Sequence, residues 1–525
     1  MSRRAWEQPV NLGTYITRSS TFWPEREALV CGERRLTYGE LERTTNRLAS
    51  ALMGRGLTAG QAVATYAGNC AEVVETEMAL CKSGLVRVPI SPRLSVDEVA
   101  HIVDDADVRV LFVDADRADA ARTALERAAV DCLLVAYDGD AGLGYAELVG
   151  EGSERAVAVE VGEDDPAVLN FTSGSTGKLK AAVQTQGNRL ANMRKRMMSS
   201  DSSPSARERY LVAGPITHAP GMPLLASLAY GSTVVVLPRW DTELFLRTIE
   251  TERITSTFVV PTMLTMLLAH PATATADLSS LRALHVGGAP VAPQRLREAV
   301  ETFGPILVQG YGQVETTSGI TELTREDILA GTTTDPDLLA SCGRPVFDTE
   351  VRIVDEAGQT VPAGTVGEVI ARGPDCVSAY WHEPELSAQT FKNGWVHTGD
   401  LGYLRHDGYL FIVDRKKDMI ISGGYNVYCS EVEAVLYAHP ALAEVCVVGV
   451  PDERWGEAVK AVVVRKPGAR AAEDEIVAFC AERLARVKKP RSVEFVDALP
   501  VNRNGKIDRR AVRARYWAGA ERRVH

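Results

Sequence analysis

Short apolar segments alternate with longer amphipathic segments from residue 36 to residue 290. The stretch 36–57, "LTYGELERTTNRLASALMGRGL", has apolar residues at helical spacing behind a Thr-x-x-Glu start, which is typical of a capped helix. Buried strands are indicated by "VATYAGN", "VRVLFVD", "STVVVLP", "ITSTFVVP" and "LRALHVGGAP". Strands that alternate with helices of ten or more residues predict parallel sheets joined by crossover helices.

The pattern changes between residues 343 and 413, where glycine turns separate short strands and favour a barrel-like or antiparallel subdomain. After "LFIVDRKKDMI" the helix and strand alternation restarts on a smaller scale. The predicted fold class is α/β, with a large N-terminal domain over residues 1–415 that combines parallel α/β sheets with a small β-barrel-like subdomain. A smaller, mobile α+β domain is expected over residues 416–525.

Length and composition limit the class of protein further. A chain of 525 residues is too long for one core, and 45% apolar with 24% charged residues is close to the average for soluble proteins. The net charge of -11 argues against nucleic acid or an anionic membrane as a partner. Without a signal peptide, a membrane-length apolar run or any CxxC pair among the nine cysteines, a cytoplasmic protein with reduced thiols is expected.

Three polar stretches carry candidate chemistry. "FTSGSTGKLK", residues 171–180, follows the apolar strand "PAVLNF" and offers the hydroxyls, glycines and lysines that phosphate binding needs. It departs from the Walker P-loop, because only two residues separate its glycines and Leu179 follows the first lysine. Taken alone, this loop could equally be a flexible polar turn.

The other two stretches each contribute one carboxylate. Glu315 in "VQGYGQVETTSG" could hold Mg²⁺ between itself and nucleotide phosphates. Asp400 in "WVHTGDLGYL" is expected just before a strand, where it could accept hydrogen bonds from ribose hydroxyls. Each of the two could also be an ordinary turn residue.

The order of these stretches, followed by "DRKKDMIISGGYNVY" and "LPVNRNGKIDRR", resembles the adenylate-forming superfamily of acyl-CoA synthetases, nonribosomal adenylation domains and luciferases. The five motifs cover residues from about 30 to 512. The resemblance implies an AMP-forming acid–thiol ligase that uses ATP, coenzyme A and Mg²⁺. In this family the acid and ATP give an acyl-adenylate, the C-terminal domain rotates, and a thiol displaces AMP.

The resemblance also assigns residues. Nucleotide and coenzyme A contacts are implied for the phosphate loop (Thr172, Ser173, Gly174, Ser175, Thr176, Gly177, Lys180), the adenine slot (Gly287, Gly288, Ala289, Pro290, Gln309, Gly310, Tyr311, Gly312, Gln313, Val314), the ribose site (Asp400, Arg415) and the pantetheine channel (Gly423, Gly424, Tyr425). Glu315, with Thr172, is implied at the metal. Lys506 would bridge the attacking carboxylate and the α-phosphate, Lys417 would be the hinge, and His218 would gate the thiol path. Without the motif context, Lys506 and Lys417 would be surface lysines and His218 a structural histidine.

The chain departs from the family pattern on the ATP side. Ala181 stands where the family has a glycine that tolerates positive φ and close approach of phosphate, at a cost of about 1 kcal/mol. Val314 replaces a threonine that donates to the α-phosphate, and Gln186 replaces a frequent histidine. One alternative is therefore an enzyme with impaired or lost adenylation that uses an acyl-adenylate from a companion enzyme.

Further alternatives are a carrier-protein-loading adenylation enzyme, a luciferase-like oxygenase and a nonenzymatic nucleotide-binding protein. Five small residues leave room for a bulky aromatic or polycyclic acid: Ala219, Gly221, Gly288, Gly310 and Gly319. The identity of the acid and the oligomeric state, including a homodimer, stay open at this point.

Overall fold

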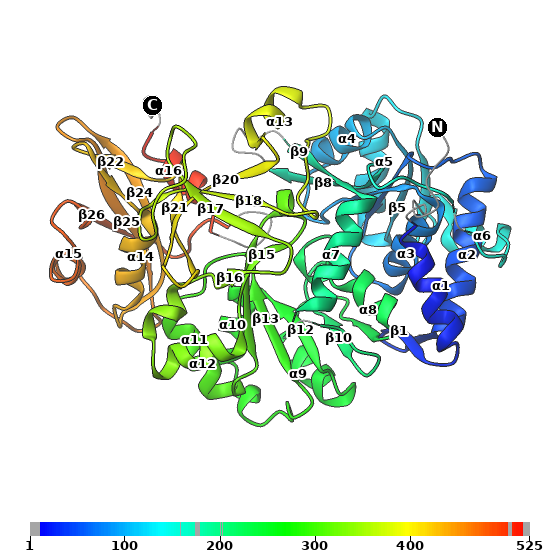
Figure 1. The fold of residues 1–525 in the computed structure, drawn as a ribbon, viewed down its shortest axis with the longest axis horizontal. Helices are drawn as coiled ribbons and strands as arrows, with labels where there is room; N and C mark the ends of the chain where they lie inside the picture. The colour runs from blue at the N-terminus through cyan, green and yellow to red at the C-terminus, as the bar shows by residue number, and fades with distance from the viewer. Residues whose placement is uncertain are drawn as a thin grey trace.

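A computed structural model describes residues 11–157, 159–173, 179–199, 201, 203–501 and 507–517. Four sheets organise the chain, and Figure 1 shows the two large α/β sheets in blue to green, the antiparallel strands in yellow and the C-terminal part in orange to red. This arrangement confirms the predicted fold class. No helix in the described part of the chain is long and apolar enough to cross a membrane, and all nine cysteines are unpaired thiols.

The first large sheet has seven strands and is parallel except at its last pair. Its order is β7 (Leu143–Gly144), β6 (Leu133–Ala136), β5 (Val108–Val113), β3 (Ala62–Tyr66), β4 (Val86–Pro89), β8 (Pro166–Ser173) and β9 (Leu179–Thr185). The pair β8 and β9 is antiparallel. The phosphate-loop stretch is therefore the turn of a hairpin at the edge of this sheet.

The second large sheet has nine strands, and its six central ones are parallel. The order is β16 (Arg344–Pro345), β15 (Gly319–Leu323), β14 (Leu307–Gly312), β13 (Ala283–Gly287), β12 (Ser256–Val259), β10 (Arg209–Val212), β11 (Thr233–Val236), β1 (Glu27–Cys31) and β2 (Arg34–Thr37). The antiparallel strands lie at the two edges. The predicted adenine-slot residues thus stand at the carboxyl ends of β13 and β14.

Helices cover both large sheets in layers. The helices of this part are α1 (Gly13–Phe22), α2 (Tyr38–Gly54), α3 (Ala71–Ser83), α4 (Val96–Asp105), α5 (Ala118–Arg127), α6 (Tyr145–Glu151), α7 (Gln186–Met198), α8 (Leu224–Tyr230), α9 (Thr242–Thr251), α10 (Pro261–Ala269), α11 (Pro293–Phe303) and α12 (Arg325–Thr333). Helices α4 and α5 pack on the outer face of the seven-stranded sheet, and α9, α10, α11 and α12 pack on the outer face of the nine-stranded sheet. Helices α2 and α3 share cores with both sheets and so lie between them.

Short 3-10 helices complete the connections between these elements. They are η1 (Ala115–Arg117), η2 (Ala219–Gly221), η3 (Pro271–Ala274), η4 (Val314–Thr316) and η5 (Pro336–Ala340). The capping box predicted from the sequence is present, because Thr37 and Glu40 exchange hydrogen bonds at the start of α2. Of the two forms considered for the middle region, the structure has the antiparallel sheet.

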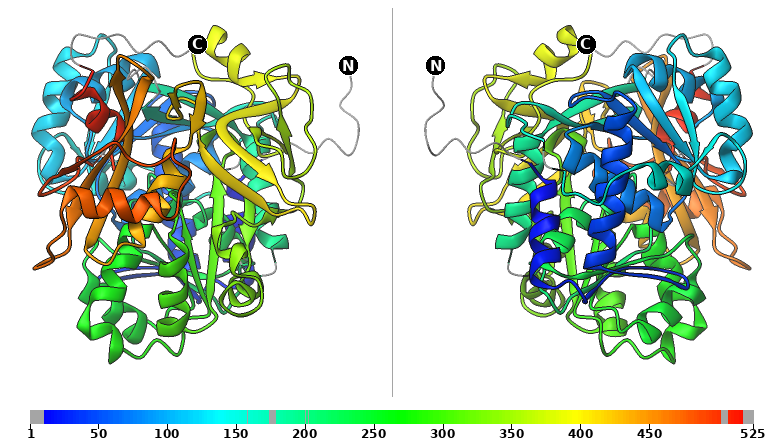
Figure 2. Two further views of the ribbon diagram at one scale, coloured as in Figure 1. Left: turned by 90° about the vertical axis from the view of Figure 1, so that its left-hand side faces the viewer. Right: turned by 90° about the vertical axis from the view of Figure 1, so that its right-hand side faces the viewer.

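That third sheet pairs β17 (Glu350–Val354), β18 (Gly367–Arg372), β20 (Trp395–Leu404), β19 (Phe391–Lys392) and β21 (Leu410–Arg415), with α13 (Pro384–Thr390) beside it. The fourth contains β23 (Tyr425–Val427), β22 (Ile420–Ser422), β25 (Gly456–Arg465), β24 (Leu442–Asp452) and β26 (Ser492–Phe495), with α14 (Cys429–Tyr437), α15 (Glu473–Ala481) and α16 (Arg509–Ala514). Figure 2 shows the orange C-terminal part beside the yellow strands. The chain changes sheets between Arg415 and Ile420, close to the expected boundary, which stays a prediction.

Candidate active site

The hairpin of β8 and β9 presents the lysine of the phosphate-loop stretch. Thr172 pairs with Lys180 and Ser173 pairs with Leu179 in the antiparallel register. Because side chains alternate along a strand, Leu179 and Ala181 enter the core of the seven-stranded sheet while Lys180 lies on the opposite face. Four predicted loop residues lie outside the described part of the chain: Gly174, Ser175, Thr176 and Gly177.

Tyr380 joins this lysine to the predicted metal carboxylate. The Lys180 Nζ donates to the Tyr380 hydroxyl at 2.5 Å and lies 3.8 Å from the ring centroid. The same hydroxyl donates to Glu315 Oε1 at 2.6 Å, and the Lys180 Nζ is 3.5 Å from that oxygen. Three groups that are far apart in the sequence therefore meet at one point.

Burial shifts the pKa values of the lysine and the tyrosine in this cluster. Desolvation lowers the pKa of Lys180, although the charge of Glu315 opposes this shift. Desolvation, together with the charge of Glu315, raises the pKa of Tyr380, so its hydroxyl stays protonated and acts as a donor. A lysine, a phenol and a carboxylate held in this way offer two donors and one metal ligand to a polyphosphate.

The residues present fit a magnesium ion shared with phosphate. In the described part of the chain no three His, Cys, Asp or Glu side chains gather as a metal site. Magnesium commonly takes one or two carboxylates and completes its shell with phosphate oxygens and water. Glu315, whose side chain is 13% exposed, is the carboxylate next to the phosphate hairpin. Thr172, the other predicted metal contact, faces Lys180 across that hairpin.

The predicted adenine slot lies where β13 and β14 end. Gly287 pairs with Gly310, and a Cβ added at Gly287 would come within 3.0 Å of the Gly310 carbonyl oxygen. Gly288 has a φ of 84°, a conformation that favours glycine. The carboxyl ends of parallel strands are where open α/β sheets bind ligands, so these glycines allow a planar group to approach the backbone.

The predicted ribose carboxylate is buried and has two partners. Asp400 is 3% exposed, accepts from the Tyr311 hydroxyl at 2.6 Å, and lies 2.7 Å from the Arg415 Nε. Burial raises the pKa of Asp400, and the charge of Arg415 opposes that shift. The expectation that Asp400 precedes a strand was wrong, because it lies inside β20, opposite Arg415 in β21.

Two of the three departures from the family pattern, Ala181 and Gln186, have side chains that are buried in the structure. Ala181 has an ordinary strand conformation, and its Cβ points into the core, so it neither needs a positive φ nor faces phosphate. The backbone N–H of Trp381 donates to the Ala181 carbonyl at 2.8 Å, which aligns Tyr380 along β9. Gln186 is 1% exposed and lines a small interior cavity beside Arg189. Neither substitution therefore obstructs the nucleotide site.

Val314 is the one departure beside the cluster of Lys180, Tyr380 and Glu315. It lies in η4, immediately before Glu315, and packs against the small cluster of Ala182, Val377 and Tyr380. The valine supplies no hydrogen-bond donor, but Lys180 and Tyr380 supply two donors beside the same carboxylate.

A buried network that the sequence did not predict supports this turn. The Lys195 Nζ lies 2.6 Å from the Asp375 carboxylate, and both side chains are nearly inaccessible. Asn192 donates to Ser318, and the Ser318 hydroxyl lies 3.5 Å from Asp375. The network links α7 to the residues that follow Glu315. No local pattern in the sequence marks a pair separated by 180 positions.

Two other predicted groups lie apart from this cluster. His218 immediately precedes η2, and its Nδ1 is 2.7 Å from the Thr217 hydroxyl. In the exposed turn of Gly423, Gly424 and Tyr425, a Cβ added at Gly424 would meet no atom within 4 Å. The roles of His218 as a gate and of this turn as a channel wall stay predictions.

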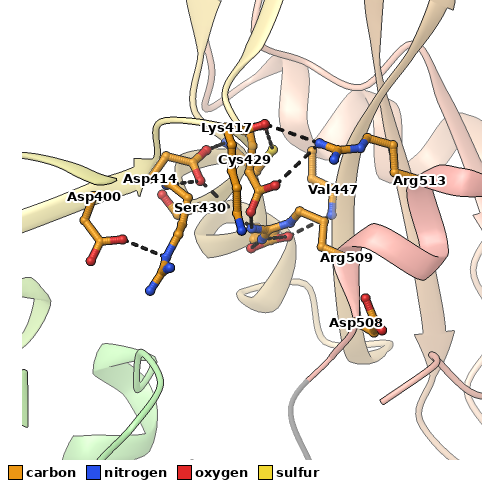
Figure 3. Close-up of polar contacts among 12 residues, drawn as sticks. Asp400, Asp414, Lys417, Cys429, Ser430, Val447, Asp508, Arg509 and Arg513 are labelled. Carbon is orange, nitrogen blue, oxygen red and sulfur yellow. Dashed lines mark hydrogen bonds and ion pairs between the residues drawn. The ribbon is translucent and has the colours of Figure 1, made fainter. Parts of the chain in front are cut away.

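Figure 3 shows the polar contacts where the chain passes from the third sheet to the fourth. Asp414 accepts from the Cys429 backbone N–H at 2.5 Å and from the Arg415 N–H at 2.7 Å. The Arg509 guanidinium lies 3.9 Å from Asp414 and donates to Glu433 at 2.6 and 2.7 Å. Burial raises the pKa of Asp414 to about 6, although the charge of Arg509 opposes this shift.

The predicted hinge residue lies at the centre of this region. The Lys417 carbonyl accepts from Arg513 at 3.3 Å. Burial and the positive charges of Arg415, Arg513 and Lys180 lower the pKa of Lys417, while Asp418 opposes the shift. The charge of Lys180 therefore reaches the predicted hinge lysine, whose role as a hinge stays a prediction. Lys506 lies outside the described residues, so its role stays a prediction.

Comparison with known proteins identifies the family. Residues 16–381 match the family described as AMP-binding enzyme, and residues 431–506 match its C-terminal domain. The chain belongs to this family. It resembles a feruloyl-CoA synthase of Amycolatopsis at 39% identity, over 96% of this chain and 99% of the relative. The medium/long-chain-fatty-acid–CoA ligase FadD8 of Mycobacterium tuberculosis is 38% identical, over 98% and 92%.

A solved structure shares the whole architecture. The o-succinylbenzoate CoA synthetase of Bacillus subtilis, in complex with its acyl-adenylate intermediate, superposes with a TM-score of 0.83 at 31% identity, over 96% of this chain and 98% of that chain. The chain is therefore an adenylate-forming enzyme of the acyl-CoA synthetase family, as the order of motifs predicted.

Proposed function

We propose that the protein joins an aromatic carboxylic acid to coenzyme A and carries out both half-reactions itself. The observation that carries the proposal is the cluster of Lys180, Tyr380 and Glu315 beside the hairpin of β8 and β9, which would face the phosphates of bound ATP. Asp400 with Arg415 supplies the complementary ribose site. The charge of Glu315 contributes to the raised pKa of Asp400, which supports the proposal that both sets of groups serve one site.

In the first half-reaction a carboxylate oxygen of the acid attacks the α-phosphorus of ATP. An oxygen–phosphorus bond forms, the bond to the β-phosphate bridging oxygen breaks, and pyrophosphate leaves. Lys180 and the Tyr380 hydroxyl would donate to phosphate oxygens, and Glu315 would hold the metal. A bound Mg²⁺ neutralises charge that develops on the phosphates. Fixed donors aimed at this charge are a large source of rate enhancement.

In the second half-reaction the thiolate of coenzyme A attacks the acyl carbon of the adenylate. A carbon–sulfur bond forms, the carbon–oxygen bond to AMP breaks, and AMP leaves with both bonding electrons. Asp400 and Arg415 hold the ribose of the nucleotide in both steps. Lys417 lies where the chain passes from the third sheet to the fourth. It is the hinge about which the C-terminal domain would rotate between the two half-reactions, so that a different surface of this domain faces the site.

The structure argues for an enzyme that needs no companion adenylating partner. The Cβ of Ala181 points into the core and so leaves the phosphate path open. For the acid, the likeness to a feruloyl-CoA synthase supports the aromatic class, and a Cβ added at Gly310 would meet no atom closer than the Thr321 carbonyl oxygen at 3.9 Å. We place the reaction in the cytoplasm, where ATP and coenzyme A are at hand.

The test is a panel of ferulic, indoleacetic, 2-succinylbenzoic and medium-chain fatty acids, each with ATP, Mg²⁺ and coenzyme A. Pyrophosphate, AMP and thioester are measured together, and synthetic acyl-adenylates replace ATP in a parallel arm. Equal release of pyrophosphate and thioester with an aromatic acid is expected. Turnover of supplied adenylate without pyrophosphate release from ATP would favour the companion-enzyme alternative. Thioester from the fatty acids alone would contradict the aromatic class.

A further inference from the structure

Arg196 holds buried donors that no residue in the described part of the chain satisfies. It lies on α7, and its Nε and Nη2 atoms are inaccessible and without a hydrogen-bond partner among the residues that the structure describes. Its guanidinium carbon lies 5.8 Å from the centroid of the Tyr210 ring. An arginine that is withdrawn from water without a carboxylate is costly unless something else meets its N–H groups.

The charge of Arg196 acts on a neighbouring histidine. His285, on β13, is 8% exposed, and burial, together with the positive charges of Arg196 and Arg325, lowers its pKa to about 3. The imidazole is therefore neutral at physiological pH and gives Arg196 no counter-charge. Arg325 is paired with Asp201, so it does not need the same counter-group as Arg196.

Arg196 and His285 lie close to the predicted nucleotide site along their own elements. Asn192 bonds to Ser318, just after Glu315, and Arg196 follows Asn192 by one helical turn, which is about 6 Å along α7. His285 precedes Gly287 by two residues, which is about 7 Å along β13. Separations of this size are comparable with the length of an aromatic ring that carries a short side chain.

An aromatic wall flanks the same place. Phe258, on the central strand β12, pairs with His285 on β13. The Phe258 ring would lie 3.2 Å from a Cβ added at Gly287. Although helices cover both faces of this sheet, the Phe258 side chain is only partly buried. Its exposure shows that space adjoins this part of β12 on the approach to the nucleotide site.

We infer that Arg196 determines specificity by binding an oxygen-bearing acceptor group at the end of the aromatic acid remote from its reacting carboxyl. The inference rests on the proposed function and refines its substrate class. An anionic carboxylate or a neutral acceptor such as a nitro or carbonyl oxygen would satisfy the Arg196 donors. A saturated alkyl chain would leave them unsatisfied, which argues against a fatty acid at this site.

The test uses three cinnamic acids of similar shape, substituted at the 4-position by carboxyl, nitro or isopropyl. The parent enzyme is expected to use the carboxyl or the nitro acid with a kcat/KM at least 10-fold above that of the isopropyl acid. Arg196→Met should remove this preference and leave the isopropyl acid unchanged or improved, since a hydrogen bond to a charged group is lost. Arg196→Lys should retain part of the preference for the carboxyl acid.

Arg194→Met is the matched control, because Arg194 is exposed on the same helix. It should leave all three values unchanged. A parent enzyme that prefers the isopropyl acid would overturn the inference while the proposed function stands, as would an equal loss on all three acids in Arg196→Met. The parent comparison requires no folded variant. No thioester from any aromatic acid would instead overturn the proposed function.

Discussion

The phosphate side and the sheet-change region are both partly buried ionic clusters, but they differ in what their charges contact. On the phosphate side, Lys180, Tyr380 and Glu315 contact one another through side-chain atoms alone. At the sheet change, Asp414 accepts from two backbone N–H groups, and the Ser430 hydroxyl donates to the Val413 carbonyl.

This difference separates groups that can engage a ligand from groups that fix the chain. Side-chain contacts can be exchanged for phosphate or metal contacts without moving the backbone. Backbone contacts of Asp414 and Ser430 cannot be exchanged without changing the path of the chain between β21 and α14. We therefore expect substitutions on the phosphate side to change the chemistry, and substitutions at the sheet change to alter stability and domain orientation.

Glu315→Gln is expected to have the largest effect. Loss of the carboxylate removes the metal ligand beside Lys180, so acid-dependent pyrophosphate release should fall by about 100-fold or more. Turnover of a supplied acyl-adenylate with coenzyme A should change little, because that step breaks no phosphate bond. Stopped assays of both half-reactions measure this split. Glu350→Gln is the control, because the Glu350 side chain, in β17, is 40% exposed. Equal loss in both steps would show that Glu315 is structural.

Asp400→Asn is expected to weaken both half-reactions, because the ribose is present in each. Loss of a charged hydrogen-bond acceptor should raise KM for ATP and the KM for a supplied adenylate by about 10-fold to 100-fold. Steady-state kinetics on both substrates, with melting temperatures, test this. An effect on only one half-reaction would show that Asp400 does not hold the ribose.

Asp414 is expected to give a moderate, pH-dependent effect on stability. Burial raises its pKa from 3.8 to about 6, so the folded state binds its proton more tightly than the unfolded state. The contribution of Asp414 to the free energy of unfolding should therefore rise by about 1 kcal/mol as the pH falls from 7 to 5. Urea unfolding of the parent and of Asp414→Asn at both pH values measures this difference. If the two proteins change in parallel, Asp414 does not titrate in this range.

The family-like changes Ala181→Gly and Val314→Thr are expected to have the smallest effect. A glycine inside β9 should cost roughly 0.5–1 kcal/mol of stability, with no gain in pyrophosphate release, because this position faces the core. Val314→Thr should change pyrophosphate release less than threefold, since Lys180 and Tyr380 already donate beside Glu315. A rise of 10-fold or more in pyrophosphate release in either variant would instead support an enzyme with impaired adenylation.

Local patterns predicted the fold well because they express local physics. The Thr37 and Glu40 capping box, the strand alternation and the glycine-rich strand ends all depend on residues a few positions apart. Tyr380 could not be found in this way, because it reaches Lys180 across 200 positions. The direction of Ala181 depends on the register of a hairpin, which the motif alone does not give. Motif comparison therefore misjudged a core residue as a phosphate contact.

The most direct test of the central proposal is one time course with ATP, Mg²⁺, coenzyme A and a preferred aromatic acid, in which pyrophosphate, AMP and thioester are all quantified. We expect the three products to appear in equal amounts, with turnover of roughly 1 to 10 per second. Pyrophosphate should still appear, as a burst of about one per active site, when coenzyme A is withheld. Thioester formation that requires a supplied acyl-adenylate, with no pyrophosphate from ATP, would contradict the proposal that one chain performs both half-reactions.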